Sequence, residues 1–352
     1  MARLAIIGAG LSGLAAAWRL RTQPIEVTIF EKSRGYSGRA ATRGKYGARY
    51  DHGANYIAPS SDRIRTLLFD HLPTDDLVQI DGEVWAFDGD GALYEPDDQD
   101  ISEKWTYARG ISTLGKVLAR SIPAVKQTET RIDHIVRSDG AWLLTDTDNV
   151  RQGPFDAVLL TPPAPQTSTI LQTSADTARD DNTRDLLTGL AEAVGSADYI
   201  PQFSYIFGYN RRIKRHGNYY GLVNDDESHD ISWIGFEHDK PERAADGENV
   251  VVVQMSPAWT ASRVNADPDR FMSDVKDLAS KVLNADLKRP EWYDTQRWRY
   301  SMPVSRADVE ALEPGKEAGL FFAGDYVAGV GRIGPAIETG LDAGDQIRQA
   351  LS

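Results

Sequence analysis

The sequence feature that most constrains the fold is a glycine-rich turn between an apolar strand and a helix near the N-terminus. Residues 2–7 form an apolar run of strand length, Gly8-Ala9-Gly10-Leu11-Ser12-Gly13 follows at once, and residues 14–20 have the Ala- and Leu-rich composition of a helix. A second β-branched run, residues 27–30, leads into Glu31. This order of strand, turn, helix, strand and acid is the dinucleotide-binding fingerprint of a Rossmann-type βαβ unit.

Each position of the fingerprint has a physical role in binding a pyrophosphate. Gly8 allows the tight turn, Gly10 lets the phosphates approach the backbone, and Gly13 lets the helix pack closely on the strand. The helix N-terminus presents free N–H groups and the positive end of its dipole to the phosphates. Glu31 can accept both hydroxyls of an adenosine ribose. The turn residues expected to contact the cofactor are Gly8, Ala9, Gly10, Leu11, Ser12 and Gly13, and this motif alone leaves FAD and NAD open.

The segment after Glu31 indicates which dinucleotide is bound. Residues 32–39 (Lys-Ser-Arg-Gly-Tyr-Ser-Gly-Arg) contain three cations and three positions at which the backbone can approach a ligand closely. This exceeds what a nicotinamide enzyme needs here and suits FAD, with its pyrophosphate enclosed from a second side and Arg39 as the expected phosphate partner. A solvated basic loop is the alternative, above all for Lys32. The predicted contacts in this segment are Glu31, Lys32, Ser33, Arg34, Gly38 and Arg39.

The composition excludes several other kinds of site. The chain has 352 residues, too many for one small core, and we expect two intertwined domains. It contains no cysteine, which excludes disulfides, thiolate metal sites, a cysteine nucleophile and a flavin tethered through sulfur. Its six histidines show no zinc spacing, so we expect no metal.

Charge and hydropathy bear on partners and location. The net charge of −13 disfavours phosphate-driven binding to nucleic acid, and no apolar run approaches the ~18 residues of a membrane span. We therefore expect a cytoplasmic protein without nucleic-acid or membrane partners. Asp outnumbers Glu and Arg outnumbers Lys, a balance that favours the salty cytoplasm of a halophile, with an ordinary acidic protein as the alternative. The oligomeric state stays open.

Two further motifs lie between residues 31 and 56. Gly38-Arg39 and Thr42 follow Glu31 at the spacing of a Glu…Gly-Gly-Arg stretch, with Ser37 in place of its first glycine. Residues 51–56 (Asp-His-Gly-Ala-Asn-Tyr) match an Asp-x-Gly-Ala-x-Tyr segment. Both motifs resemble those of the FAD-dependent amine-oxidase superfamily, which includes protoporphyrinogen oxidases and carotenoid desaturases, and in which the second segment runs under the flavin ring. The resemblance implies non-covalent FAD and further cofactor contacts from Ala54, Asn55 and Tyr56.

Segments near both ends and in the middle of the chain are similar to the renalases within that superfamily. The segments that carry this likeness are residues 30–35, 153–158, 161–166, 297–300, 324–325 and 331–332. The likeness is weak over residues 60–105 and 170–290, where substrate is normally bound. It implies oxidation of isomeric dihydronicotinamides to NAD(P)⁺, with O₂ reoxidising the flavin and forming H₂O₂.

The resemblance also implies cofactor contacts from the second half of the chain. Residues 319–325 form an apolar strand that ends in Gly-Asp, and Asp325 matches the residue that binds the ribityl and pyrophosphate region. A helix opened by residues 332–336 would direct its N-terminus at the pyrimidine end of the ring, where reduction places negative charge. The implied contacts are Ile132 (to adenine, through its backbone), Thr161, Pro162, Trp298, Gly324, Asp325, Arg332, Ile333, Gly334 and Ala336.

The pattern of elements predicts an α/β fold with two domains. The first is a Rossmann-type FAD-binding domain of the p-hydroxybenzoate-hydroxylase-like kind, and the second is an α+β substrate domain built on an antiparallel sheet. We assign residues 1–60, 105–165 and 295–352 to the FAD-binding domain. Residues 61–104 and 166–294 form the substrate domain.

Local patterns in the substrate domain predict its elements. Residues 82–95 alternate apolar and polar around Asp-Gly-Asp-Gly and indicate a hairpin. Several β-branched and aromatic runs within residues 199–257 predict the antiparallel sheet, which in this family roofs the flavin. A helix is expected over residues 268–283, and the polar residues 172–185 are expected to form a loop.

Hydride transfer to flavin N5 depends on orientation of the substrate more than on catalytic side chains, and the sequence shows no nucleophile or triad. Tyr56, Trp298 and Tyr300 are the residues expected to line the substrate cavity over the ring. Trp233 and Trp259 are further candidates from the roof. Core packing is the alternative for each of these aromatic residues.

Two other residues bear on the reaction class. His52 is a candidate base or covalent tether, although a packed histidine is favoured. Lys240 lies where amine oxidases place a lysine that holds a water near N5, but residues 240–243 resemble a turn, which argues against a typical amine oxidase. Amine oxidation, isoprenoid desaturation and a non-catalytic flavin or nucleotide carrier stay open beside the renalase-like reading. The expected partners are a small-molecule substrate such as a dihydronicotinamide nucleotide, and O₂ as acceptor.

Overall fold

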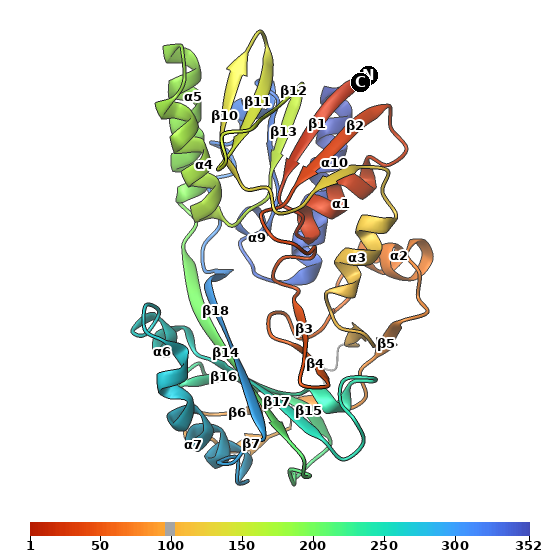
Figure 1. Ribbon diagram of the computed structural model, residues 1–352, viewed down its shortest axis with the longest axis vertical. Helices are drawn as coiled ribbons and strands as arrows, with labels where there is room; N and C mark the ends of the chain where they lie inside the picture. Colours follow the sequence, from red (N-terminus) through yellow and green to blue (C-terminus); the bar gives the residue numbers. More distant parts are fainter. Residues whose placement is uncertain (96–102) are drawn as a thin grey trace.

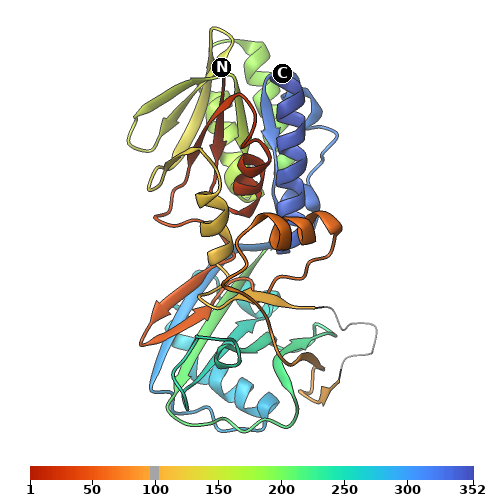
Figure 2. The ribbon, with the colours of Figure 1, turned by 90° about the vertical axis from the view of Figure 1, so that its right-hand side faces the viewer.

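The computed structural model describes residues 1–95 and 103–352. Figure 1 shows an upper part with both termini and a parallel sheet, and a lower part with a larger sheet. Two long strands, β14 (Tyr199–Tyr209) and β18 (Trp292–Pro303), run from the lower sheet toward the upper part. Figure 2 shows the same division from the side, with the two termini at the upper end.

The upper sheet has five parallel strands in the order β19-β13-β1-β2-β9. Their bounds are β19 (Leu320–Phe322), β13 (Ala157–Leu160), β1 (Ala2–Ile7), β2 (Ile25–Phe30) and β9 (Val125–Gln127). β1 and β13 are almost entirely buried, as expected for strands covered on both faces. The predicted Rossmann-type domain is confirmed.

Different layers cover the two faces of the parallel sheet. Leu4 and Ile6 of β1 pack against the helices of one layer, whereas Ala5 and Ile7 face the other. The first layer consists of α1 (Leu11–Arg19), α3 (Thr113–Arg120) and α10 (Ile333–Ala350). The second consists of the antiparallel strands β10 (Ile132–Ser138), β11 (Ala141–Asp146) and β12 (Arg151–Phe155), with helices α4 (Ala164–Asp176) and α5 (Asp181–Gly195).

The expectation of a loop over residues 172–185 is wrong, because α4 and α5 occupy most of that segment. Residues 177–180 join the helices, and the Asp180 carboxylate caps α5 by accepting a hydrogen bond from the Thr183 N–H at 2.8 Å. Polar side chains cover the exposed faces and conceal the helical period. The buried apolar positions are Ile170, Leu171, Leu187, Leu190 and Val194.

These two helices also bear on the proposed division into domains. They share a core with the strands of the upper part. The division itself stays a prediction, but the substrate-domain boundary proposed at residue 166 is better placed after α5, near residue 196.

The lower sheet has seven strands in the order β18-β14-β17-β16-β15-β6-β7. It is antiparallel as predicted, except that β15 and β6 run parallel. The predicted hairpin is confirmed as β6 and β7. The remaining bounds are β17 (Asn249–Met255), β16 (Ile231–Phe236), β15 (Tyr219–Asn224), β6 (Glu83–Phe87) and β7 (Leu93–Tyr94).

The two faces of the lower sheet have different neighbours. One face packs on α6 (Pro257–Ala261) and on α7 (Met272–Leu283), which continues the 3₁₀ turn η3 (Pro268–Phe271), so the helix expected over 268–283 is confirmed. The other face packs on the hairpin of β3 (Thr42–Lys45) and β4 (Ala48–Asp51). This second face is therefore directed toward the segment that follows β4.

Short elements complete the described chain. They are α2 (Asp62–Thr66), the π-helical turn η1 (Leu67–His71), β5 (Leu77–Gln79), β8 (Trp105–Tyr107), the 3₁₀ turn η2 (Glu237–Asp239), α8 (Glu313–Glu317) and α9 (Asp325–Ala328). Among the helices of residues 1–95 and 103–352, none has both the length and the apolar character required to cross a bilayer.

Helices α1 and α10 cross at a glycine, which yields a test of the packing. A Cβ atom on Gly340 would lie 2.2 Å from the Ser12 carbonyl oxygen, whereas one on Gly189 of α5 would meet nothing within 4 Å. We expect Gly340→Ala to lower the free energy of unfolding by about 1–3 kcal/mol, because the helices must separate. Gly189→Ala should raise it by about 0.5–1 kcal/mol through helix propensity. Urea denaturation measures both, and equal effects would contradict the close crossing.

Candidate cofactor and substrate site

The predicted cofactor residues converge at one edge of the parallel sheet. Gly8, Glu31, Thr161 and Gly324 follow, respectively, β1, β2, β13 and, one residue further on, β19. Parallel strands place their carboxyl ends at the same edge, which is where open α/β sheets bind ligands. Motifs separated by more than three hundred residues, such as those at Gly8 and Gly324, are thus brought together by the sheet order.

The glycine turn forms a cradle that side chains would fill. Gly8 has a φ of +103°, and a Cβ atom there would lie 2.5 Å from Thr161 Oγ1. A Cβ atom on Gly13 would lie 2.2 Å from the Gly8 carbonyl oxygen. Gly10 precedes α1 and provides no side-chain cap, so the first N–H groups of α1, at Leu11 and Ser12, are suited to phosphate.

A second loop lies against this turn. The Ser37 N–H donates to the Ala9 carbonyl at 2.9 Å, and a Cβ atom on Gly38 would lie 3.3 Å from the Gly10 Cα. Ser37, which stands where the related motif has glycine, adopts a φ of +89°, a conformation that glycine adopts more readily. Its buried hydroxyl has no partner among the described residues. The turn and the second loop therefore lie in direct contact, which supports the prediction of a pyrophosphate held from two sides.

The acidic and basic residues after β2 have separate environments. Glu31 accepts hydrogen bonds from the N–H groups of Ala9 and Ser33, both at 2.8 Å, so its carboxylate braces the turn. Its remaining lone pairs are suited to the predicted ribose contact. Lys32 donates to Gln166 at 3.0 Å and Arg34 is exposed. These two basic side chains lie at the rim of the cofactor edge.

The strongest polar contact at this edge joins Arg39 to Asp325. Two hydrogen bonds of 2.6 and 2.8 Å form a bidentate pair, and the Tyr199 hydroxyl donates to the same carboxylate at 2.6 Å. Burial would lower the pKa of Arg39, but the Asp325 carboxylate outweighs it and raises the pKa above its ordinary value. Arg39 also donates to the carbonyls of Tyr300 and Ser301 at 3.2 and 3.0 Å. The predicted phosphate and ribityl partners are thus adjacent.

The N-terminus of α10, the start of β10 and the residues after β13 also belong to the predicted cofactor site. Arg332 precedes α10 without a side-chain cap, and a Cβ atom on Gly334 would lie 3.0 Å from Ser60 Oγ. The N-terminus of α10, with Ile333 and Ala336 in its first turn, therefore lies close to the backbone after the 51–56 segment. Ile132 is buried at the start of β10, and the Pro162 carbonyl accepts from Thr167 at 2.8 Å. Their cofactor contacts stay predictions.

The 51–56 segment runs between the two parts of the molecule. Its backbone is tied to the cofactor edge, because the Ala54 N–H donates to the Arg39 carbonyl at 3.0 Å. The Trp298 indole donates to the His52 carbonyl at 2.8 Å, and the two rings stack with centroids 5.4 Å apart. Asn55 and Tyr56 are half-buried at the end of the segment. Trp298 therefore fixes the segment that resembles the family's flavin-ring segment.

His52 is a packed, neutral histidine. Burial, with a smaller contribution from the Arg43 guanidinium, lowers the pKa of His52 to about 4. The Nδ1 atom is buried and has no partner in the described chain. This environment supports the packing interpretation that the sequence favoured.

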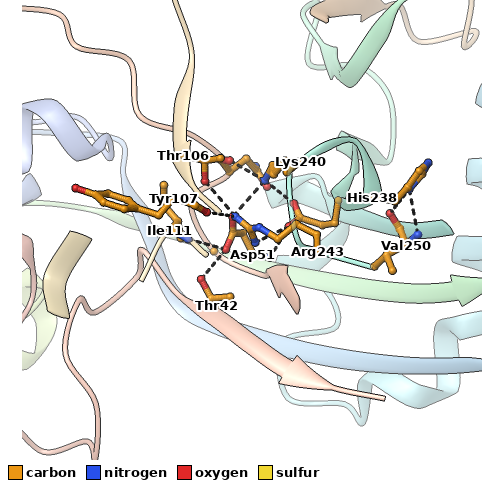
Figure 3. Close-up of polar contacts among 12 residues, drawn as sticks. Thr42, Asp51, Thr106, Tyr107, Ile111, His238, Lys240, Arg243 and Val250 are labelled. Atoms are coloured by element: carbon orange, nitrogen blue, oxygen red, sulfur yellow. Dashed lines mark hydrogen bonds and ion pairs between the residues drawn. The ribbon is translucent and has the colours of Figure 1, made fainter. Parts of the chain in front are cut away.

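Behind the segment lies a buried ion-pair cluster, which we define as Asp51, Glu237, Lys240 and Arg243 (Figure 3). Lys240 lies 3.2 Å from Asp51 and 2.5 Å from Glu237, and Arg243 lies 2.8 Å from Asp51 and 3.1 Å from Glu237. All four side chains are at most 2% exposed. Burial would raise the pKa of Asp51, but Lys240 and Arg243 outweigh it and lower the pKa below its ordinary range.

Neutral groups supply further partners to Asp51 and Arg243, although the buried Arg243 Nε has no partner among the described residues. Asp51 accepts from the Thr42 hydroxyl at 2.6 Å and from the Ile111 N–H at 3.0 Å. Arg243 donates to Thr106 and to the Tyr107 carbonyl, both at 3.1 Å. The cluster thereby connects the β3–β4 hairpin, β8, the start of α3 and the lower sheet.

Lys240 has a more extensive set of buried contacts than its sequence context indicated. Residues 240–243 do follow a turn, η2, but the Lys240 side chain is directed inward. Its three N–H groups have three acceptors, the two carboxylates of the cluster and the Asn55 carbonyl at 2.9 Å. The spacing of Glu237, Lys240 and Arg243, three residues apart each time, is the sequence signal that could have indicated a shared face.

The aromatic residues that were expected to line one cavity pack on different partners in the structure. Trp298 stacks on His52, whereas Tyr300 lies edge-on to Tyr199, 6.2 Å between centroids, beside the Arg39–Asp325 pair. Tyr56 and Trp233 approach each other at 6.1 Å. Their roles as cavity residues stay predictions, with Trp298 and Tyr300 at the cofactor side.

Trp259 does not join these residues, and that expectation is wrong. It lies in α6 and packs on Phe203 and Phe271, on the face of the lower sheet directed away from the 51–56 segment. The sequence could not assign a face to a tryptophan in a helix that follows the sheet.

Comparison with known proteins agrees with this architecture. Two family models match the chain: an NAD(P)-binding Rossmann-like domain over residues 6–72 and a flavin containing amine oxidoreductase over residues 97–348. Protoporphyrinogen oxidase 2 of Arabidopsis thaliana is 37% identical over 68 residues, a stretch that covers 19% of this chain and only 13% of the relative.

Two solved structures are similar over almost the whole chain. A provisionally assigned protoporphyrinogen oxidase from an Exiguobacterium species has a TM-score of 0.76 and 15% identity, covering 99% of both chains. Putrescine oxidase bound to putrescine has a TM-score of 0.72 and 13% identity, covering 98% of both. These similarities establish a shared fold.

The ion-pair cluster yields a prediction about stability. Lys240→Met should lower the free energy of unfolding by about 3–5 kcal/mol, because two buried carboxylates would then share one cation. Lys316→Met is the matched control, since Lys316 pairs with Glu313 at the surface and should contribute within about 0.5 kcal/mol. Denaturant titration compares the two, and equal losses would contradict the importance of the buried cluster.

His52 yields a prediction about pH. Because its folded-state pKa of about 4 is below the unfolded value of about 6.5, the unfolded chain binds a proton first as the pH falls. This residue should therefore remove about 2 kcal/mol of stability between pH 7 and pH 5. Urea titrations of the wild type and of His52→Gln at both pH values measure it, and the variant should lose correspondingly less. An identical pH dependence would show that His52 is not held neutral.

Proposed function

Because the chain belongs to the family of flavin-containing amine oxidoreductases, we propose that it is an FAD-dependent oxidase whose substrate donates a hydride to flavin N5. The proposed substrates are dihydronicotinamides, isomers of NAD(P)H, with O₂ as the final acceptor and H₂O₂ as the second product. Oxidation of an amine is the second candidate, since putrescine oxidase has a similar fold.

The observation that carries the cofactor assignment is the convergence of four groups at one sheet edge. The Gly8–Gly13 turn would hold the pyrophosphate on backbone N–H groups, Glu31 the adenosine ribose, and Arg39 and Asp325 the phosphates and ribityl chain. The N-terminus of α10 would stabilise negative charge at the far end. When bound, FAD supplies the two-electron acceptor.

The chain's own residues orient the substrate and exclude water. Trp298 and the ion-pair cluster fix the backbone of the 51–56 segment through the His52 and Asn55 carbonyls. A fixed segment between cofactor and substrate favours hydride transfer by holding the donor carbon close to its acceptor. No side chain need accept a proton in this step, because a dihydronicotinamide loses only a hydride.

The charge behind the segment favours a neutral substrate over a cationic amine. Asp51 and Glu237 are each paired with both Lys240 and Arg243, so they offer no uncompensated negative charge to an ammonium group. Lys240 is committed to three acceptors and has no N–H left to hold a water beside N5. Both observations support the dihydronicotinamide proposal over amine oxidation.

The proposed function is tested by an absorption spectrum followed by anaerobic titration with equilibrated NADH that contains its minor isomers. We expect a yellow protein whose flavin bleaches to an extent set by the minor isomers, and H₂O₂ on admission of air. Bleaching by putrescine and not by these isomers would favour the amine candidate. A flavin that no donor bleaches would indicate a carrier, and a protein unable to take up FAD would overturn the cofactor assignment.

Arg39 provides a separate test of the cofactor site. Arg39→Met should weaken FAD binding by roughly tenfold or more, because a charge-assisted contact to phosphate is lost. Arg43→Met is the matched control, since Arg43 also pairs with an aspartate, but its partner Asp294 lies in β18 and not at the cofactor edge. Fluorescence titration of apoprotein with FAD measures both, and unchanged affinity in Arg39→Met would contradict the assigned role.

A further inference from the structure

Three buried polar atoms beside Tyr56 have no hydrogen-bond partner among the described residues. They are the Tyr220 hydroxyl, the Trp233 Nε1 and the Asn55 Oδ1. Tyr220 is 1% exposed and Trp233 is 7% exposed, and their rings lie 6.3 Å apart. Buried polar groups are nearly always paired, and one left unpaired costs about 1–3 kcal/mol. An explanation is therefore required for three that occur together.

Strand geometry places the three residues on one face of the lower sheet. Trp233 lies opposite Gln254 in the β16–β17 ladder, and Asn55 donates to that glutamine, so both border the same face. The pairing of β15 with β6 is irregular between Tyr219 and Gly221, and this bulge brings Tyr220 beside Trp233 while Tyr219 packs in the core of the opposite face. The face in question is the one directed toward the 51–56 segment.

Two glycines make room for the Trp233 ring. Cβ atoms on Gly221 and Gly235 would lie 2.4 and 2.7 Å from atoms of the indole. The ring therefore lies flat over β15 and β16, with its N–H above Gly235. Three apolar side chains pack around this ring: Ile80, Val84 and Val223. A flat heterocycle could pack against them, beside the polar atoms.

A relay of amides fixes the orientation of Asn55. The Gly53 carbonyl can only accept, so the Gln254 amide nitrogen faces it at 2.7 Å. The Gln254 oxygen then accepts from the Asn55 nitrogen at 3.1 Å, which leaves the Asn55 oxygen as the unpaired atom. Asn55 thus presents an acceptor, whereas the Trp233 indole presents a donor only.

The three atoms together favour a ligand group that both accepts and donates hydrogen bonds. The ligand must accept from an indole N–H and donate to an amide oxygen, and the Tyr220 hydroxyl can complete either contact. An ammonium group cannot accept, a carboxylate cannot donate, and an isoprenoid can do neither. A primary carboxamide does both within one planar group.

We propose that Trp233 and Asn55, with Tyr220, form a recognition site for a neutral primary carboxamide on the substrate ring. The Trp233 N–H donates to the carboxamide oxygen, and the Asn55 side-chain oxygen accepts from the carboxamide nitrogen. This inference rests on the proposed function, because a dihydronicotinamide carries such a group, and it assigns the residues that select it.

The test measures binding, so it does not depend on turnover. Holoprotein is titrated with nicotinamide mononucleotide and with its 3-acetylpyridine analogue, which keeps the carbonyl and lacks the NH₂ group, while the flavin spectrum is followed. We expect the wild type to bind the carboxamide roughly tenfold more tightly, as one hydrogen bond would give. Trp233→Phe should weaken both ligands by a similar factor, and Asn55→Leu should abolish the preference between them.

The matched control is Tyr219→Phe, which removes another unpaired buried hydroxyl on the opposite face of the same sheet. It should bind both ligands as the wild type does. Equal affinity of the wild type for both ligands, or unchanged binding in Trp233→Phe, would overturn the recognition site.

The two proposals fail separately. If the carboxamide preference is found but dihydronicotinamide isomers do not bleach the flavin, the recognition site stands and the proposed reaction is wrong. If the isomers bleach the flavin in Trp233→Phe and Asn55→Leu at the wild-type rate, the reaction stands and the recognition site is wrong.

Discussion

Two carboxylates and two cations removed from water can coexist only where each charge is offset by an opposite charge nearby and most of their hydrogen-bonding atoms have partners. The ion-pair cluster meets this condition with atoms from segments far apart in the chain: Asp51 ends β4, Glu237 begins η2, and Thr106 lies in β8. Any displacement of one segment exposes an uncompensated charge in a low-dielectric interior. The relative positions of the hairpin, β8 and the lower sheet therefore depend on this cluster, and through the Asn55 carbonyl so does the 51–56 segment.

The cofactor edge uses charge in a different way. Arg39 is 30% exposed while its partner Asp325 is 4% exposed, so the pair is open on the arginine side. An open arginine can share its guanidinium with a phosphate and keep its carboxylate contact, since it has five N–H donors in a planar fork. The ion-pair cluster has no such freedom, because both cations are almost completely enclosed. The Arg39–Asp325 pair is therefore suited to binding a ligand, whereas the ion-pair cluster is suited to holding the surrounding segments in place.

The parts of this structure that could be predicted are those with local sequence signals. The turn from Gly8 to Gly13 and the acid at 31 specify a βαβ unit within one short stretch, and the fold class and flavin family are confirmed. Motif resemblance assigned Arg39 and Asp325 separately to the same cofactor, but it did not predict their bidentate contact. The expectation for residues 172–185 failed because the buried positions within that stretch are small or polar (Ser174, Ala175 and Thr183), and the larger buried apolar residues of α4 and α5 lie outside it.

Contacts that depend on tertiary placement had no local signal. Lys240 and Asp51 are 189 residues apart, and no pattern near either residue indicates the other. Trp233 and Trp259 are equally plausible in sequence, but a strand register directs the first toward the 51–56 segment and a following helix places the second behind the sheet. Tyr220 is on the site face because of a bulge that alternation alone would not predict.

The buried titratable groups at and behind the 51–56 segment are neutral or offset one another, and this follows from the same constraints. His52 is neutral because burial lowers its pKa to about 4, and burial raises the pKa of Tyr220 far above its ordinary value. The ion-pair cluster contributes two charges of each sign. A donor that enters neutral and leaves as a cation loses no proton to such a surface, so it needs orientation and not a base. Charge at the cofactor edge and unpaired neutral dipoles at the proposed substrate side therefore suit hydride transfer from a neutral ring better than deprotonation of an ammonium ion.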